Sequence, residues 1–270
     1  MIKDITLGQY FPGNSILHRL DPRMKLVLTI FFVTLLFCLG NFLGYMLFTV
    51  LTIIIVYISK IPFSLVLRSI RPLFFIILFT TALNIFLTPG DVILKLPLLN
   101  WTVTMQGVEI AVTMILRIVY LIIGTSMLTY TTSPIMLTDA IESLLSPLKK
   151  LKVPVHEFAM MMTIALRFIP TLIEETDKII NAQKARGADF ETGGLIKRSK
   201  ALIPILVPLF VYAFRRAIDL AVAMECRCYK GGEGRTKMKQ YHLKLRDFFA
   251  LFFMVDVTVI VVVLNIVGAR

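Results

Sequence analysis

Long apolar runs alternate with short polar segments along most of the chain. Five of these runs approach the roughly 20 residues that a helix needs to cross the hydrocarbon core of a bilayer. They lie at about Leu26–Leu39, Phe42–Ile58, Pro72–Leu87, Gly107–Tyr130 and Phe248–Val267. The pattern predicts about five transmembrane helices, the first two joined by the turn at Gly40-Asn41.

Residues 131–246 follow a different pattern, in which apolar residues recur at helical spacing and polar residues take the opposite face. Three helices are predicted there, over Ser133–Lys150, Pro154–Arg186 and Leu195–Arg227. The predicted fold class is therefore an all-α integral membrane protein, with about five transmembrane helices and three long amphipathic helices inserted before the last one. This organisation divides the chain into residues 1–130, 131–246 and 247–270.

The second amphipathic helix changes character along its length. Its first half, Phe158–Phe168, is apolar almost all round and contains three consecutive methionines, Met160–Met162. Its second half is amphipathic, and Pro170 predicts a kink between the two halves. At 1.5 Å per residue, a helix of this length extends about 50 Å.

The composition supports the membrane class. Hydrophobic residues make up 57% of the 270 residues, charged residues make up 17%, and the mean hydropathy is +0.81. These values lie far from those of soluble globular domains. The net charge of +12 accompanies no nucleic-acid-binding motif. We therefore interpret the excess of Lys and Arg as the mark of cytoplasmic segments and predict no nucleic-acid partner.

The placement of basic residues predicts the topology. Basic residues cluster before the first run, after the second run and throughout residues 131–246. The turn at Gly40-Asn41 has none, and the loop after Leu87 has only Lys95. We therefore expect a multi-pass protein with a cytoplasmic N-terminus, a cytoplasmic 131–246 region and an extracellular C-terminus.

Two of the predicted helices end in the same way. The second stops at Ala185-Arg186-Gly187, with Gly187 where a left-handed residue closes a helix. The third stops at Cys226-Arg227-Cys228. Either arginine alone is typical of ordinary capping, because the helix dipole favours a cation at a C-terminus. The pair favours docking to acidic sites on another protein, since small neighbours expose the guanidinium group and Arg binds a carboxylate through two hydrogen bonds.

Two charged residues fall inside the apolar runs. Arg117 and Asp256 are candidates for an intramembrane charge pair, and snorkelling to the membrane boundary and a transport site are the alternatives. The three cysteines match neither a disulfide framework nor a zinc site, so no metal site is predicted.

Over nearly its whole length, the chain resembles the T component (EcfT, CbiQ-like) of energy-coupling factor transporters, a branch of the ATP-binding-cassette importers. The resemblance rests on Asp21-Pro22-Arg23-Met24-Lys25, Arg167-Phe168-Ile169-Pro170 and Ala185-Arg186-Gly187. Cys226-Arg227-Cys228 occupies the second X-Arg-X position of that family, with cysteine on both sides of the arginine.

The resemblance implies a coupling subunit of a bacterial cell membrane rather than an enzyme. Two ABC-type ATPase subunits would each dock on one X-Arg-X tip. The amphipathic helices would act as coupling helices that move a membrane-embedded, substrate-binding S component, with vitamin uptake as the result. The chain contains no Gly-Lys-Ser or Gly-Lys-Thr of a P-loop, so the partners would hydrolyse ATP, and no cofactor is expected.

Other functions remain open. A module dedicated to cobalt or nickel would have the same architecture, because the S component carries the substrate specificity. An independent secondary transporter would use Arg117 and Asp256 as its transport site and would move substrate without partners. An intramembrane enzyme is disfavoured, because the sequence has no His/Glu metal pattern and no Ser or Cys with a plausible base.

Overall fold

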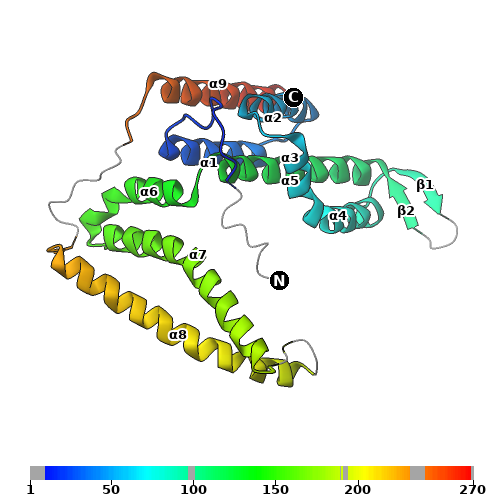
Figure 1. Ribbon diagram of the computed structural model, residues 1–270. Coiled ribbons are helices and arrows are strands. Elements are labelled where there is room, and N and C mark those ends of the chain that lie inside the picture. The colour runs from blue at the N-terminus through cyan, green and yellow to red at the C-terminus, as the bar shows by residue number, and fades with distance from the viewer. Residues whose placement is uncertain (1–9, 97–100, 189, 191–193, 232–240, 269–270) are drawn as a thin grey trace. The chain divides into compact units, whose positions relative to one another are not determined.

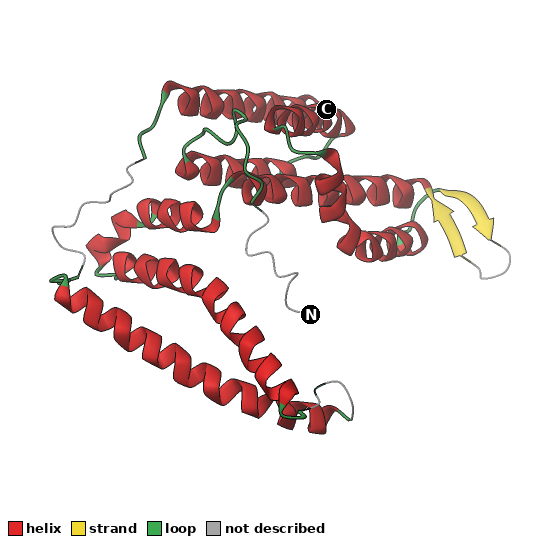
Figure 2. Ribbon diagram, in the orientation of Figure 1, coloured by secondary structure: helices red, strands yellow, loops and turns green. Residues whose placement is uncertain are grey.

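The computed structural model describes residues 10–96, 101–188, 190, 194–231 and 241–268. Residues 1–9 and 269–270, at the two ends of the chain, lie outside the described residues. The chain divides into two compact units. The bundle unit comprises residues 8–140 and 240–270, and the hairpin unit comprises residues 1–7 and 141–239. Helices dominate both units (Figure 2), so the predicted helical membrane class is confirmed.

The bundle unit is built around α5 (Met105–Thr131), its longest helix. α1, α2, α3 and α4 all pack against α5, whereas α9 packs against α1 and α2 (Figure 1). A short 3-10 turn, η1, joins α3 to α4. The bounds of these elements are α1 Pro22–Phe37, α2 Phe42–Ser59, α3 Phe63–Ile70, η1 Arg71–Leu73, α4 Phe74–Leu87 and α9 Leu245–Gly268.

Side-chain caps set two of the helix starts. The Asp21 carboxylate accepts a hydrogen bond from the Arg23 N–H at 2.9 Å, and Pro22 occupies the first helical position. This cap explains why α1 begins four residues before the apolar run that predicted it. Thr104 caps α5 in the same way by accepting from the Gly107 N–H at 3.1 Å. Both helices start where a polar side chain satisfies an otherwise unpaired N–H.

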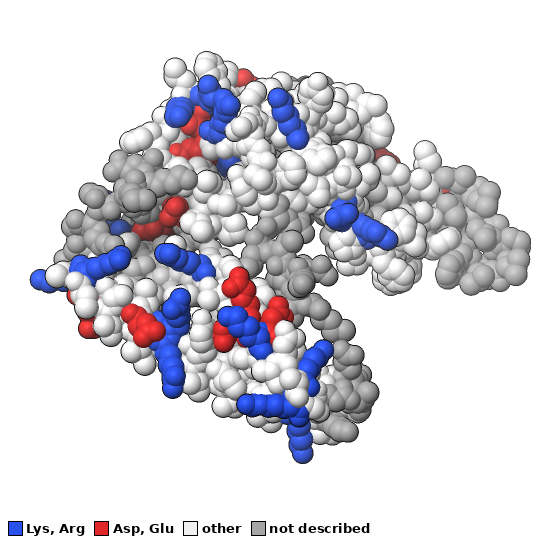
Figure 3. Space-filling model, in the orientation of Figure 1, with Lys and Arg blue, Asp and Glu red and all other residues white. Residues whose placement is uncertain are grey.

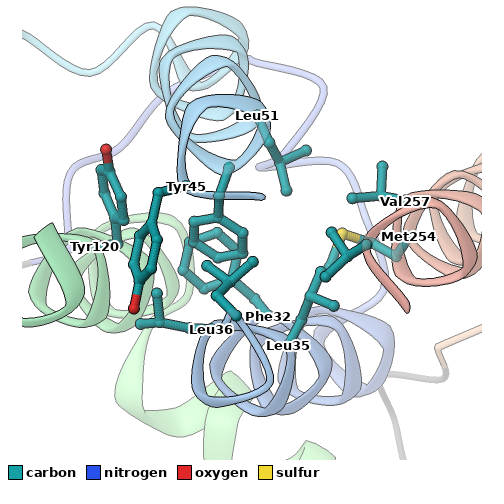
Figure 4. Packing of buried hydrophobic residues seen from close by; sticks show 11 residues of the cluster. Phe32, Leu35, Leu36, Tyr45, Leu51, Tyr120, Met254 and Val257 are labelled. Carbon is teal, nitrogen blue, oxygen red and sulfur yellow. The ribbon is translucent and has the colours of Figure 1, made fainter. Parts of the chain in front are cut away.

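Four helices of the bundle unit meet in one apolar core (Figure 4). Phe32 of α1 and Phe48 of α2 lie with their ring centroids 4.6 Å apart, and the Phe48 and Tyr120 centroids are 5.5 Å apart. α9 adds Met254 and Val257 from the other side. A Cβ at Gly124 of α5 would lie 2.3 Å from the Phe32 ring, so only glycine lets the ring approach α5 here. Aromatic packing thus ties α1, α2 and α5 together.

The segment after α4 differs from the loop that the sequence predicted. β1 (Val92–Leu96) and β2 (Trp101–Thr104) pair as an antiparallel hairpin. Val, Ile, Trp and Thr favour strands, and the hairpin needs only a few residues of each strand to form its ladder. The expectation of a loop after Leu87 was wrong for these nine residues.

The hairpin unit contains two helices of more than 30 residues, α7 (Val155–Ala185) and α8 (Leu195–Cys226). The single helix predicted over Ser133–Lys150 is instead α6 (Pro134–Leu144) followed by a 3-10 helix, η2 (Ser146–Leu151). Pro147 has no N–H to continue the α-helical hydrogen bonds, which explains the change to 3-10 geometry. The boundary between the two units falls within α6.

Within the described residues, six helical segments are long and apolar enough to cross a membrane. Four of them correspond to predicted spans, namely α2, α3 with α4, α5 and α9. The predicted first span is the 16-residue α1, which is shorter than that criterion requires. α7 and α8 meet the criterion by length and composition, and their cytoplasmic placement stays a prediction.

Candidate functional site

The predicted docking residues lie at the two ends of the α7–α8 hairpin. α7 and α8 pack against each other and run in opposite directions (Figure 1). α7 changes direction about halfway along, and Pro170 lies near its middle, as the sequence predicted. α8 has 32 residues, so its two ends are about 48 Å apart at 1.5 Å per residue. Arg186 and Arg227 therefore form two well-separated sites rather than one.

Two prolines in α8 create a specific contact with α7. Pro208 has no N–H, so it cannot donate to the Pro204 carbonyl one turn earlier. The side-chain amide of Gln183 in α7 lies 3.5 Å from that carbonyl oxygen and donates to it. Gln183 is in the last turn of α7, two residues before Ala185. This hydrogen bond to α8 thus helps to fix the end of α7 that carries Arg186.

The α7 tip closes in a Schellman motif. Arg186 is the C-cap, and Gly187 follows in the left-handed conformation with φ +84°. The Gly187 N–H donates to the Lys184 carbonyl at 3.0 Å, and the Ala188 N–H donates to the Gln183 carbonyl at 3.0 Å. These are the two hydrogen bonds that define the motif. The left-handed role predicted for Gly187 is confirmed.

The α8 tip closes with the same two hydrogen bonds. Arg227 is the C-cap, the Cys228 N–H donates to the Glu225 carbonyl at 2.8 Å, and the Tyr229 N–H donates to the Met224 carbonyl at 3.0 Å. Cys228 takes the left-handed position with φ 55°. A residue with a Cβ pays an energetic cost for this conformation. The two tips therefore share one backbone geometry although their sequences differ.

The shared geometry leaves both arginines accessible. Ala185, Arg186 and Gly187 are exposed, and so are Cys226, Arg227 and Cys228. Both cysteines are free thiols. Each guanidinium extends from a helix C-terminus, where the aligned carbonyl groups favour a cation. The structure thus presents two exposed arginines on matched and rigidly closed turns, which suits recognition of carboxylates.

Large apolar side chains are also exposed on the hairpin unit. Met161 and Met162 of α7 are 58% and 41% exposed, so two of the three methionines singled out in the sequence are at the surface. α8 presents a row at four-residue spacing, each member more than half exposed: Phe210, Phe214, Ile218 and Val222. The sequence analysis did not single out this row. Exposed apolar surface of this kind marks contact with a membrane or a protein partner.

The two intramembrane charges do not form an ion pair in the structure. The Arg117 guanidinium donates to the Tyr45 hydroxyl at 3.0 Å and lies over the Phe37 ring, 5.8 Å from its centroid. Asp256 is exposed on α9. Arg117 lies on α5, and its partners Phe37 and Tyr45 come from α1 and α2. Asp256 lies on α9, which packs mainly against α1 and α2 rather than against α5. The Arg117–Asp256 pair considered from the sequence is therefore not formed. Arg117 instead makes a cation–π contact with Phe37 and a hydrogen bond with Tyr45.

The Asp-Pro-Arg-Met-Lys motif joins three helices of the bundle unit. The Lys25 ammonium donates to the Thr131 carbonyl at 2.8 Å and to the His18 carbonyl at 3.2 Å. Thr131 ends α5, so Lys25 supplies a hydrogen-bond donor to an otherwise unpaired carbonyl group at a helix C-terminus. The Phe11 N–H does the same for the Tyr130 carbonyl at 2.9 Å. The segment before α1 therefore caps α5.

Asp247 connects the same segment to α9. Its carboxylate accepts from the Asp21 N–H at 2.9 Å and from the Lys244 N–H at 2.8 Å. Burial raises the pKa of the Tyr241 hydroxyl, and the carboxylates of Asp139 and Asp21 raise this pKa further. The sequence marked Asp21 to Lys25 only as a family motif. Asp247, more than 200 residues away, gave no local signal of this role.

These features define an α-helical, multi-pass membrane protein with two exposed arginine tips. The family model described as CbiQ, cobalt transport protein, matches residues 13–238. A protein of Ruminiclostridium cellulolyticum is 56% identical over 240 residues, covering 89% of each chain. A protein of Clostridium kluyveri is 54% identical over 253 residues, covering 93% of each chain.

A further relative from Bacillus subtilis is 50% identical over 241 residues, covering 89% of this chain and 90% of its own. All three carry the name energy-coupling factor transporter transmembrane protein EcfT. The chain belongs to this family and is a transmembrane component of an energy-coupling factor transporter.

Proposed function

We propose that this chain couples ATP hydrolysis by two cytoplasmic ABC-type ATPase subunits to movement of a membrane-embedded S component. The observation that carries the proposal is the pair of matched tips. Arg186 and Arg227 are both C-caps, both exposed and both followed by a left-handed residue in a Schellman turn. Schellman turns are common at helix ends, and here they present an exposed arginine at each end of the α7–α8 hairpin in the same way. This equivalence supports the docking of two like partners.

The arrangement of the hairpin supports a mechanical role. Each tip offers an arginine that binds a carboxylate through two hydrogen bonds. α7 and α8 join the tips through helices that pack on one another, so movement of a partner at either tip displaces the whole hairpin. The exposed apolar row from Phe210 to Val222 offers the S component a surface on the same helix. The chain itself has no P-loop, so the ATPase activity belongs to its partners.

The proposed topology places the N-terminus and residues 131–246 in the cytoplasm of a bacterial cell and the C-terminus outside. Residues 1–130 and 247–270 form the membrane part, and residues 131–246 form the coupling region. The concentration of basic residues in that region supports this orientation. It also brings both arginine tips to the side of the membrane where ATP is available.

Co-purification tests the proposal directly. The chain is purified in detergent together with its ATPase partners, as wild type and as the double variant Arg186→Glu/Arg227→Glu. The matched control is Lys184→Glu/Lys230→Glu, which makes the same charge change at exposed positions beside each tip. We expect the arginine variant to lose the ATPases and ATP-driven uptake in vesicles, and the lysine variant to retain both. Equal retention by all three proteins would contradict docking at the tips.

We propose a vitamin as the transported substrate, and a cobalt or nickel module is the second candidate. The family description, cobalt transport protein, favours the second candidate, whereas the relatives are named for energy coupling without a substrate. Uptake of radiolabelled vitamins and of cobalt by vesicles containing the full complex separates these candidates. Substrate uptake by this chain alone would instead support an independent secondary transporter.

A further inference from the structure

A groove of about 410 Å³ lies within the bundle unit, where α1, α2, α5 and α9 meet. Leu28 and Phe32 of α1, Ile54 of α2, Met127 of α5 and Phe253 of α9 contribute to its apolar wall. The lining residues of α1 extend from Lys25 to Phe32, which corresponds to about 10 Å along the helix axis. The groove is therefore apolar over most of its length.

The polar residues of this groove gather at one end. Lys25, Thr131 and Arg246 are among the lining residues. They stand at the start of α1, the end of α5 and the start of α9. α5 and α9 are long and apolar enough to span a membrane, so these helix ends mark the boundary between hydrocarbon and headgroups. The groove thus has a basic end at headgroup level and an apolar end within the hydrocarbon.

The charges around the basic end favour an anion. Residues 15–25 and 242–247 contribute Arg19, Arg23, Lys25, Lys244 and Arg246, against Asp21 and Asp247. The Asp21 carboxylate accepts a hydrogen bond from the Arg23 N–H. The Asp247 carboxylate accepts hydrogen bonds from the N–H groups of Asp21 and Lys244. Figure 3 shows Lys and Arg side chains gathered near the starts of α1 and α9. Arg246 is exposed, so its guanidinium is accessible to a headgroup phosphate.

We propose that this groove binds one anionic phospholipid, with an acyl chain along the apolar wall and the headgroup phosphate at Arg246. Basic pockets between transmembrane helices recognise lipid headgroups in this way. The lipid would contact Lys25, which donates to the end of α5, and Arg246 at the start of α9. Anionic lipid is therefore expected to hold together the end of the bundle unit where the chain before α1 crosses these helices.

Native mass spectrometry of the full chain tests the proposal. The protein is extracted by mild detergent from vesicles of phosphatidylcholine and phosphatidylglycerol, and the retained lipids are counted. We expect one retained phosphatidylglycerol per wild-type chain. Ala250→Phe places a ring in the groove and is expected to reduce retention at least ten-fold. Ala82→Phe on α4, which does not line the groove, is the matched control and is expected to bind as the wild type does.

A second pair of variants tests the charge without changing the groove volume. Arg246→Gln is expected to retain lipid but to lose about five-fold of its preference for phosphatidylglycerol over phosphatidylcholine, as removal of one interfacial cation predicts. Arg68→Gln, another exposed arginine outside the groove, should keep that preference. Equal binding by wild type and Ala250→Phe, or an unchanged preference in Arg246→Gln, would overturn the assignment. Displacement of the lipid by a co-purifying membrane partner would also overturn it, in favour of a protein segment.

Discussion

Substitutions at the two left-handed positions, Gly187 and Cys228, test whether the tips are equivalent turns. Gly187→Ala adds a Cβ where φ is +84°, and no heavy atom lies within 4 Å of that Cβ apart from its immediate neighbours in the chain. The change therefore adds a conformational cost and no steric clash. That cost is about 1 kcal/mol for a residue with a Cβ in the left-handed region. Cys228→Gly removes the same cost from the α8 tip.

These energies translate into opening of the last helical turns. Hydrogen exchange of peptides covering each tip reports the opening free energy, and about 1 kcal/mol corresponds to a roughly five-fold change in rate. We expect Gly187→Ala to accelerate exchange at the α7 tip about five-fold. Cys228→Gly should slow exchange at the α8 tip by a similar factor.

Each variant supplies the control for the other tip, because Gln183 at the end of α7 contacts Pro204 and about 33 Å of α8 lies between Pro204 and Cys226. Unchanged exchange at the mutated tip would refute the Schellman account. An equal change at both tips would show that the two turns do not open independently.

Three further predictions address the residues around these sites. Alkylation of Cys226 and Cys228 with a maleimide adds bulk on both sides of Arg227, so it should release one ATPase subunit, and Cys226→Ser/Cys228→Ser should be resistant in the same co-purification. Pro208→Ala supplies the missing N–H for the Pro204 carbonyl. The cost of Gln183→Leu, about 0.5–1 kcal/mol in the wild type, should therefore shrink in that background; equal costs in a double-mutant cycle of thermal stability would argue against the contact. Lys25→Met leaves the Thr131 carbonyl without its donor and the Asp21 and Asp247 carboxylates without a neighbouring cation, so we expect a loss of about 2–3 kcal/mol in detergent. Lys60→Met, at an exposed position, should melt as the wild type does.

Local patterns in the sequence were sufficient for the longest helices and for one of the two tips. Gly187 indicated a left-handed turn because glycine is the usual residue there, and the structure agrees. Cys228 takes the same conformation without any local signal for it. The matching of the two turns became visible only from their hydrogen bonds, since a cysteine does not predict a positive φ.

Contacts between distant segments could not be predicted from the sequence. Arg117 and Asp256 were considered as a pair because each charge needs a partner in a membrane, but Arg117 contacts Tyr45 and Phe37 instead. Aromatic side chains are frequent in apolar runs, so the sequence does not indicate which of them contacts a cation. The role of Asp247 in joining α9 to Asp21 depends equally on tertiary packing.

The stoichiometry of the purified complex tests the central claim most directly. The mass of the nucleotide-free complex is measured for wild type, Arg186→Glu, Arg227→Glu and the double variant. Independent docking at two tips predicts two ATPase subunits per chain in the wild type, one in each single variant and none in the double variant. Two ATPase subunits retained by either single variant would contradict the account.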